Sequence, residues 1–267
     1  FAVKVDSRTG VEADDWTVGE LFGAAGVLGT DTDESGTDIE DDHPRRVEVR
    51  SPADVQRGGS TTPIADARNA LGSTVVVQGV ITWAPSFDDR VIFLQDETAG
   101  IALFDFGLSD FEPVGGFEAG DLVRIRASVG AFGGETQLED VEDLEVKAKV
   151  AVPSPRGVTG AQLNAGQFQG ELVSITGEVL EIDVLSFGNQ RVTWRDGAGT
   201  DFFVYADSRT GVEEDAWTVG ENVLVSGVVG ANDSNDPAAR VEVRGLSDVQ
   251  VVSAGVISIA QARAMMG

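Results

Sequence analysis

Residues 74–81 read TVVVQGVI and residues 172–179 read LVSITGEV, so two stretches 98 positions apart (172 − 74) share an alternating pattern with a glycine at the sixth place. Such alternation predicts a β-strand with one buried face. A glycine inside a strand contributes no packing and usually marks a bend or a bulge. We therefore predict that Gly79 and Gly177 lie where a first strand turns sharply.

The rest of the chain repeats as well. Residues 6–20 (DSRTGVEADDWTVGE) return as residues 207–221 (DSRTGVEEDAWTVGE) with two differences. A looser version, residues 117–121 (FEAGD), stands where residues 217–221 (WTVGE) stand, an offset of 100 (217 − 117). Self-similarity at a fixed spacing indicates a chain built from copies of one unit.

The repeat divides the chain into four parts: the C-terminal half of a module (1–57), two complete modules (58–153 and 154–253) and the head helix of a further one (254–267). Each complete module is expected to open with a short helix, at 62–71 and at 158–166. Five strands should follow in each: 74–81, 90–95, 101–106, 120–126 and 136–146, then 171–179, 190–195, 201–206, 221–229 and 240–244. The chain reads as a window of a longer tandem array, whose severed ends a neighbouring module or chain would complete.

The pattern resembles a known family. A head helix, a first strand with a central glycine and a fourth strand opened by glycine and an acid (Gly120-Asp121, Gly220-Glu221) are similar to bacterial OB-fold modules. Such modules occur in tandem in secreted and surface proteins, sometimes beside extracellular nuclease or phosphatase domains. The resemblance implies an all-β fold of tandem five-stranded OB-like Greek-key barrels with short helices, at an extracellular or cell-surface location.

Composition narrows the function. The formal net charge is −26, from 45 acidic and 19 basic residues, which weighs against phosphate-driven binding of nucleic acid. The chain has no cysteine, which excludes disulfides and thiolate metal sites. Its single histidine, His43, leaves most nucleophile–base pairs without a member, so we expect no enzyme. No apolar run reaches the length of a membrane span, and no membrane insertion is expected in this window.

An acidic loop partly follows the spacing of a calcium-binding loop. Residues 31–42 (DTDESGTDIEDD) place oxygen donors at positions 1, 3 and 5, glycine at 6 and a carboxylate at 12. They depart from it in the aspartate at position 12, in a polar residue at position 8 and in the lack of flanking helices. Calcium is therefore a candidate cofactor, and a solvated loop is the alternative interpretation. The candidate ligands are Asp31, Asp33, Ser35, Asp38 and Asp42.

OB folds usually bind ligands on the face of their second and third strands. In the last module that face predicts a stacking platform for bases or sugars, built from Arg191, Trp194, Arg195, Phe203 and Tyr205. The alternative is that these aromatic residues pack against a neighbouring module or subunit. Trp16 and Trp217, each before a Gly-acid pair, are expected to close one end of their barrels.

Two functions remain open at this point. The first is a non-enzymatic structural repeat protein, an array of OB barrels in an extracellular surface or filament, whose partners are other copies of the same module or chain. The second is a binding module for single-stranded nucleic acid or a glycan. In the second case the chain could be an accessory domain of a secreted nuclease.

Overall fold

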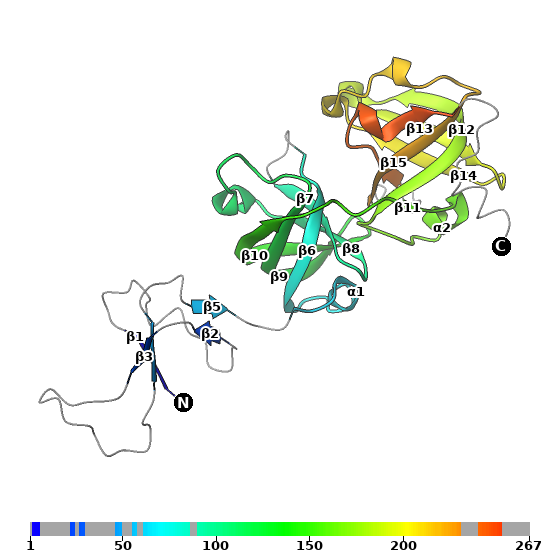
Figure 1. The fold of residues 1–267 in the computed structure, drawn as a ribbon. Coiled ribbons are helices and arrows are strands. Elements are labelled where there is room, and N and C mark those ends of the chain that lie inside the picture. Colours follow the sequence, from blue (N-terminus) through cyan, green and yellow to red (C-terminus); the bar gives the residue numbers. More distant parts are fainter. Residues whose placement is uncertain are drawn as a thin grey trace, which may run out of the picture. The chain divides into compact units, whose positions relative to one another are not determined.

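The computed structural model describes residues 61–85, 90–230 and 240–252, and the backbone of five strands within the first 60 residues. The chain separates into two compact units, residues 1–60 and 61–267. In the larger unit two β-barrels follow one another along the chain (Figure 1). Among the described residues, no helix is both long enough and apolar enough to cross a membrane.

Five short strands belong to the smaller unit. β1 pairs parallel with β4, β4 pairs antiparallel with β3, and β2 pairs antiparallel with β5. In the barrels of the larger unit, the third strand likewise pairs parallel with the fifth, and the fifth pairs antiparallel with the fourth. β1, β4 and β3 therefore correspond to the third, fifth and fourth strands of a barrel. The five strands are β1 (Ala2–Val5), β2 (Phe22–Ala24), β3 (Val27–Gly29), β4 (Arg46–Val49) and β5 (Val55–Arg57).

The first barrel is closed by five strands in the order β6-β7-β8-β10-β9, with β9 returning to β6. All neighbours are antiparallel except β8 and β10, which run parallel. This strand order is that of an OB fold. Its elements are α1 (Ile64–Ala67), β6 (Thr74–Trp83), β7 (Val91–Gln95), β8 (Gly100–Phe104), a 3-10 helix (Leu108–Phe111), β9 (Asp121–Phe132) and β10 (Glu135–Lys149).

The second barrel repeats the same connections. Its strands follow the order β12-β13-β14-β16-β15, and the β12–β15 pairing closes the ring. Two short strands extend the sheet, β11 beside β12 and β17 beside β15. Its elements are β11 (Arg156–Gly157), α2 (Gly160–Asn164), β12 (Leu172–Val184), β13 (Gln190–Asp196), β14 (Asp201–Ala206), β15 (Asn222–Gly230), β16 (Arg240–Glu242) and β17 (Val249–Val251), with 3-10 helices at Ser186–Gly188, Ser208–Thr210, Glu214–Ala216 and Leu246–Asp248. The all-β, OB-like fold class is confirmed.

The two strand glycines, predicted to mark a sharp turn, lie where the first strand changes partner. β6 pairs with β9 from Thr74 to Val80 and with β7 from Val80 onward, so Gly79 stands at the crossing. A Cβ at Gly79 would lie 3.1 Å from the backbone oxygen of Gln95, and a Cβ at Gly177 would lie 2.8 Å from that of Arg195. The close approach of the neighbouring strand leaves no room for a side chain at Gly177, and at Gly79 a side chain would fit only if that strand shifted by a few tenths of an ångström.

The head helices are shorter than predicted and are held by a contact that the sequence did not suggest. α1 begins at Ile64, and its N-cap residue, Pro63, makes no side-chain hydrogen bond to it. Instead, the carboxylate of Asp96 accepts a hydrogen bond from the Ile64 backbone N–H at 2.9 Å. In the second barrel Asp196 accepts one from the Gly160 N–H at the same distance. An aspartate at the end of the second strand thus ties each helix to its barrel.

Each barrel has its own apolar core. The first core includes Val77, Ile81 and Leu94, all fully buried. The second contains Trp194 and Trp217, whose rings meet edge to face with centroids 5.7 Å apart. Trp217 donates its indole N–H to Oε1 of Gln190 at 2.6 Å, so a buried polar group is satisfied inside the core. Trp16 lies outside the described residues.

Some strand limits differ from the prediction. β9 runs to Phe132 and β10 begins at Glu135, because the two strands continue as a hairpin well beyond the apolar stretch at 120–126. β8 ends at Phe104, two residues earlier than expected, and β16 ends at Glu242. Alternation of side chains located these strands, whereas backbone pairing sets their ends.

Candidate ligand-binding face

The outer surface of β13 and β14 carries four of the five residues that the sequence proposed as a platform. Phe202 and Val204 point into the barrel, so the intervening Phe203 and Tyr205 lie on the outer face, where both are partly exposed. The strand register places Arg191 opposite Tyr205. This surface, defined by Arg191, Arg195, Phe203, Tyr205 and Arg240, is called the β13–β14 face below.

Trp194 does not belong to this face. Its exposed fraction is 0%, and its ring packs 5.9 Å from that of Phe202 inside the core. Its inclusion as a ligand-binding residue was wrong, because Trp194 alternates with the outward Arg191, Thr193 and Arg195 and therefore shares the buried side of β13.

Arginine side chains cover the aromatic rings. The guanidinium carbon of Arg191 lies 5.5 Å from the ring centroid of Phe203, and that of Arg240 lies 4.2 Å from the centroid of Tyr205. These distances are in the range of cation–π contacts. Arg240 lies on β16, which pairs parallel with β14, and sequence reasoning missed it because that strand is distant in sequence.

Every arginine of the face also has a carboxylate partner. Arg191 pairs with Asp183 at 2.8 Å, and Arg195 forms a two-pronged contact with Asp201 at 2.7 and 3.0 Å. Arg240 pairs with Glu242 at 2.9 Å. The hydrogen bonds from Arg195 hold the pKa of the Asp201 carboxyl below its usual value. The face therefore offers flat rings and planar cations but little unbalanced positive charge.

Tyr205 is anchored at its hydroxyl end. The side-chain amide of Asn189 donates a hydrogen bond to the Tyr205 oxygen at 2.7 Å. Burial raises the pKa of the Tyr205 hydroxyl above its usual value, which disfavours ionisation of the ring. A neutral, fixed ring is suited to stacking.

The corresponding face of the first barrel is covered by the second barrel. Phe93 and Ala102, on the outer side of β7 and β8, form a buried cluster with Leu172 of β12 and Val228 of β15. The Leu172 backbone N–H donates to Oε1 of Gln95 at 2.9 Å. This surface is an interface between barrels.

Polar contacts continue around this interface. Arg68 donates to the backbone oxygen of Gln169 at 2.7 Å, and Arg244 donates to that of Thr82 at 3.0 Å. At its centre the backbones of Gly100 and Gly170 nearly touch, because a Cβ on Gly100 would lie 2.3 Å from the carbonyl carbon and oxygen of Gly170. Only a residue without a side chain fits there.

The two faces differ at equivalent positions. By strand register, Arg195 and Asp201 of the second barrel stand where the first barrel has Gln95 and Gly100. Likewise Phe203 stands where the first barrel has Ala102. The second barrel thus has charged pairs and a ring at positions where the first barrel has a buried docking surface. The two barrels thus carry different chemistry on the same part of the fold.

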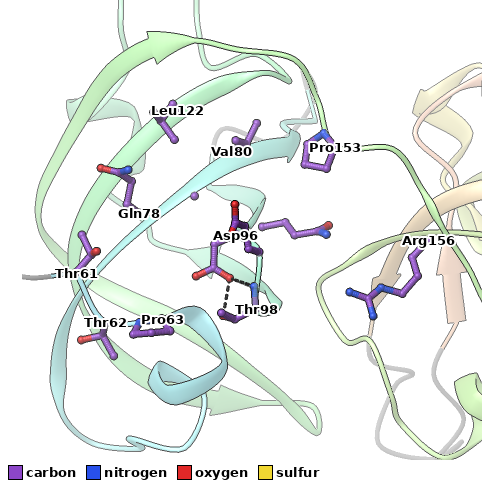
Figure 2. A pocket seen from close by; sticks show the side chains of 13 residues that line it. Thr61, Thr62, Pro63, Gln78, Val80, Asp96, Thr98, Leu122, Pro153 and Arg156 are labelled. Carbon is purple, nitrogen blue, oxygen red and sulfur yellow. Dashed lines mark hydrogen bonds between the residues drawn. The ribbon is translucent and has the colours of Figure 1, made fainter.

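A separate hollow of about 810 Å³ lies beside α1 (Figure 2). Figure 2 shows Asp96 between β6 and α1, with Arg156 at the far side. Asp96 accepts hydrogen bonds from the backbone and hydroxyl of Thr98 at 2.7 and 2.6 Å in addition to that from Ile64. Arg156 pairs with Glu171 at 3.1 Å. The charged groups labelled here are engaged in holding the structure, and no histidine or lysine is among the described residues that line the hollow.

The predicted calcium loop, residues 31–42, lies outside the described residues, and calcium stays a prediction. Within the described part of the chain, no group of three or more histidine, aspartate or glutamate side chains is placed to hold a metal ion.

Comparison with known proteins adds little to the geometry. No protein-family model and no curated protein sequence matches the chain. Among solved structures, it is similar to the single-stranded DNA binding protein from Thermus aquaticus, with 14% identity over 73% of this chain and 100% of that one and a TM-score of 0.25. It is also similar to the tetrameric p202 HIN2, with 12% identity over 66% and 93% and a TM-score of 0.30.

A third similar structure is a replication protein A heterotrimer bound to single-stranded DNA. It shares 10% identity over 84% of this chain and 77% of that one, with a TM-score of 0.27. TM-scores this low carry no argument about what the present chain binds. The assignment of the OB-like fold rests on the strand order described above.

Proposed function

We propose that the chain is a non-enzymatic binding protein that holds single-stranded nucleic acid on the β13–β14 face. The observation that carries this proposal is the pair Phe203 and Tyr205, two residues apart on one side of one strand, each beside an arginine. Residues so placed are about 6.6–6.8 Å apart, and each ring can take one unstacked base.

Stacking rather than charge supplies the binding energy in this proposal. Base–aromatic stacking contributes about 1–3 kcal/mol per base. The three arginines are already paired with carboxylates, and the net charge of −26 opposes a polyanion. Binding should therefore depend weakly on salt, with a slope of log K against log salt no steeper than about −0.7, which corresponds to one or fewer phosphates neutralised on a single strand.

The experiment uses the fact that Tyr205 is the chain's single tyrosine. Incorporation of 3-fluorotyrosine gives one ¹⁹F NMR signal, which reports on this face directly. Titration with short single-stranded oligonucleotides should shift that signal. Phe203→Ala should weaken binding about 5- to 150-fold, the equivalent of one lost stacking contact. Phe132→Ala, a change at an exposed ring of the first barrel, is the matched control and should have no effect.

Two results would contradict the proposal. A signal that stays unchanged with oligonucleotides at low salt removes nucleic acid as the ligand, because low salt is the most favourable condition for phosphate contacts. A signal that instead moves with oligosaccharides assigns the same rings to a glycan. The charge-paired arginines and carboxylates of the face would then serve as hydrogen-bond partners for hydroxyl groups.

A structural role is the second candidate, and the interface between the barrels favours it. The buried contact of Phe93 and Ala102 with Leu172 and Val228 is the type of nearest-neighbour interface that holds a tandem array together. In this alternative the chain belongs to an extracellular surface or filament made of such modules. Sedimentation across a wide concentration range tests it, and an unchanged monomer throughout would argue against assembly.

A further inference from the structure

A second hollow, of about 640 Å³, opens on the first barrel where β8 ends beside the β9–β10 hairpin. It is distant in sequence from the β13–β14 face and belongs to another barrel. Three phenylalanines and three carboxylates line most of it: Phe104, Phe106, Phe132, Asp105, Glu139 and Asp140. No basic side chain is among the described residues that line it.

The aromatic rings of this pocket are unusually exposed. Phe106 is 81% exposed and Phe132, at the end of β9, is 77% exposed. Phe104 and Phe106 meet edge to face, with centroids 5.3 Å apart and planes at 80°. Phe104 already takes part in a cation–π contact, because the guanidinium carbon of Arg90 lies 5.8 Å from its centroid. Phenyl groups left open to water around a hollow indicate a ligand surface.

The carboxylates are held in place around these rings. Asp105 is fixed by hydrogen bonds from the backbone N–H groups of Gly107 and Val141, at 2.6 and 2.7 Å. The carboxylate of Glu139 lies against Gly130, where a Cβ would come within 2.0 Å of it. The absence of a side chain at Gly130 therefore makes room for this acid.

Asp140 stands out among the three acids. It lies in a bulge of β10, and its φ of 51° falls in the left-handed region that non-glycine residues seldom adopt. Bulges commonly redirect a side chain toward a site. The Asp140 side chain makes no hydrogen bond or ion pair with any residue that the structure describes, so its charge is available to a ligand.

We propose that this pocket binds a small organic cation of the quaternary ammonium type. The faces of aromatic rings attract such cations, whose charge is spread over methyl groups and is weakly hydrated. A primary ammonium group is compact and strongly hydrated, which makes it less suited to phenyl walls. The carboxylates supply the complementary charge, and the net charge of −26 raises the concentration of any cation near the surface.

The test compares choline with 3,3-dimethylbutan-1-ol, a neutral molecule of the same shape, using backbone amide NMR of the full chain. Choline should shift the amides around the pocket, and the neutral analogue should shift them much less. Phe106→Leu and Asp140→Asn should each weaken choline binding about two- to five-fold. Asparagine also tolerates positive φ, so the second variant removes charge without adding strain. The matched controls are Phe187→Leu and Asp215→Asn, exposed residues of the second barrel.

Each outcome decides the matter. Equal binding of choline and its neutral analogue would show an apolar hollow without cation selectivity and overturn the proposal. No shift with either molecule would also overturn it. Vesicles of phosphatidylcholine that bind while free choline does not would assign the pocket to a membrane surface instead of a small molecule. The proposal is independent of the β13–β14 face, and the fluorotyrosine signal of Tyr205 should therefore not respond to choline.

Discussion

Substituting alanine for Gly100 should loosen the contact between the two barrels. The new Cβ would lie 2.3 Å from the backbone of Gly170 and 2.4 Å from the N–H nitrogen of Glu171, whereas ordinary contact begins at 3.4 Å. The obstacle is backbone, so no side-chain rotation relieves it. The barrels would have to separate by roughly 1 Å or accept strain, and overpacking of this kind typically costs about 1–3 kcal/mol.

Separation has a second cost. The hydrogen bond from the Leu172 N–H to Gln95 is 2.9 Å long, and lengthening it by roughly 1 Å breaks it. A buried N–H without a partner costs about 1–3 kcal/mol more. The expected loss is therefore about 2–6 kcal/mol, which corresponds to a fall in Tm of at least about 4 °C for a unit of this size.

Urea and thermal unfolding measure this loss, and amide hydrogen exchange at Leu172 locates it. Gly157→Ala is the control, since a Cβ there would meet nothing within 4 Å. The reasoning fails if Gly100→Ala is as stable as Gly157→Ala while the Leu172 amide remains protected. That result would mean that the barrels do not dock through this glycine pair.

Three further changes test the fold and its hydrogen bonds. Gly177→Ala should destabilise the protein by about 1–3 kcal/mol, because the new Cβ would lie 2.8 Å from the opposite backbone oxygen. Gly79→Ala should cost less, since the corresponding distance is 3.1 Å. Equal urea midpoints for the two variants would contradict this. Trp217→Phe should lower the free energy of unfolding, measured in urea, by about 1–3 kcal/mol, because it leaves the buried Gln190 acceptor without the indole N–H. A cost near zero would show that water replaces the donor. Burial raises the pKa of Asp96, but the hydrogen bonds it accepts outweigh this effect and hold that pKa below its usual value of 3.8. The unfolded chain then binds more protons in acid, so stability should fall as the pH drops below about 4, and Asp96→Asn should flatten that part of the stability profile.

Much of the fold could be predicted from local sequence pattern. Alternation located the strands of both barrels. The glycine in each first strand identified the position where that strand changes partner, because two backbones approach closely there and leave little room for a side chain. The aspartate contacts that hold the two helices were not predictable in this way. Asp96 lies 32 residues from Ile64 in sequence, and nothing local indicates that the two meet.

The candidate site was predicted only in part. Alternation along β14 correctly placed Phe203 and Tyr205 outside, and the same rule applied to β13 would have excluded Trp194. Arg240 was missed because its contact with Tyr205 depends on the parallel pairing of β14 with β16. The pocket around Phe106 was missed because the end of β8 and the β9–β10 hairpin, which form it, are distant in sequence. The bulge at Asp140 leaves no clear signal in sequence.

The glycine pair also limits how such barrels can be strung together. A linear polymer generated by one repeated rotation and translation needs the same socket on every member. The first barrel offers that socket through Gly100, but the second carries Asp201 at the matching place, paired with Arg195. A third barrel therefore cannot dock on the second barrel in the way that the second docks on the first. In any longer array the repeating unit would be a pair of unlike barrels.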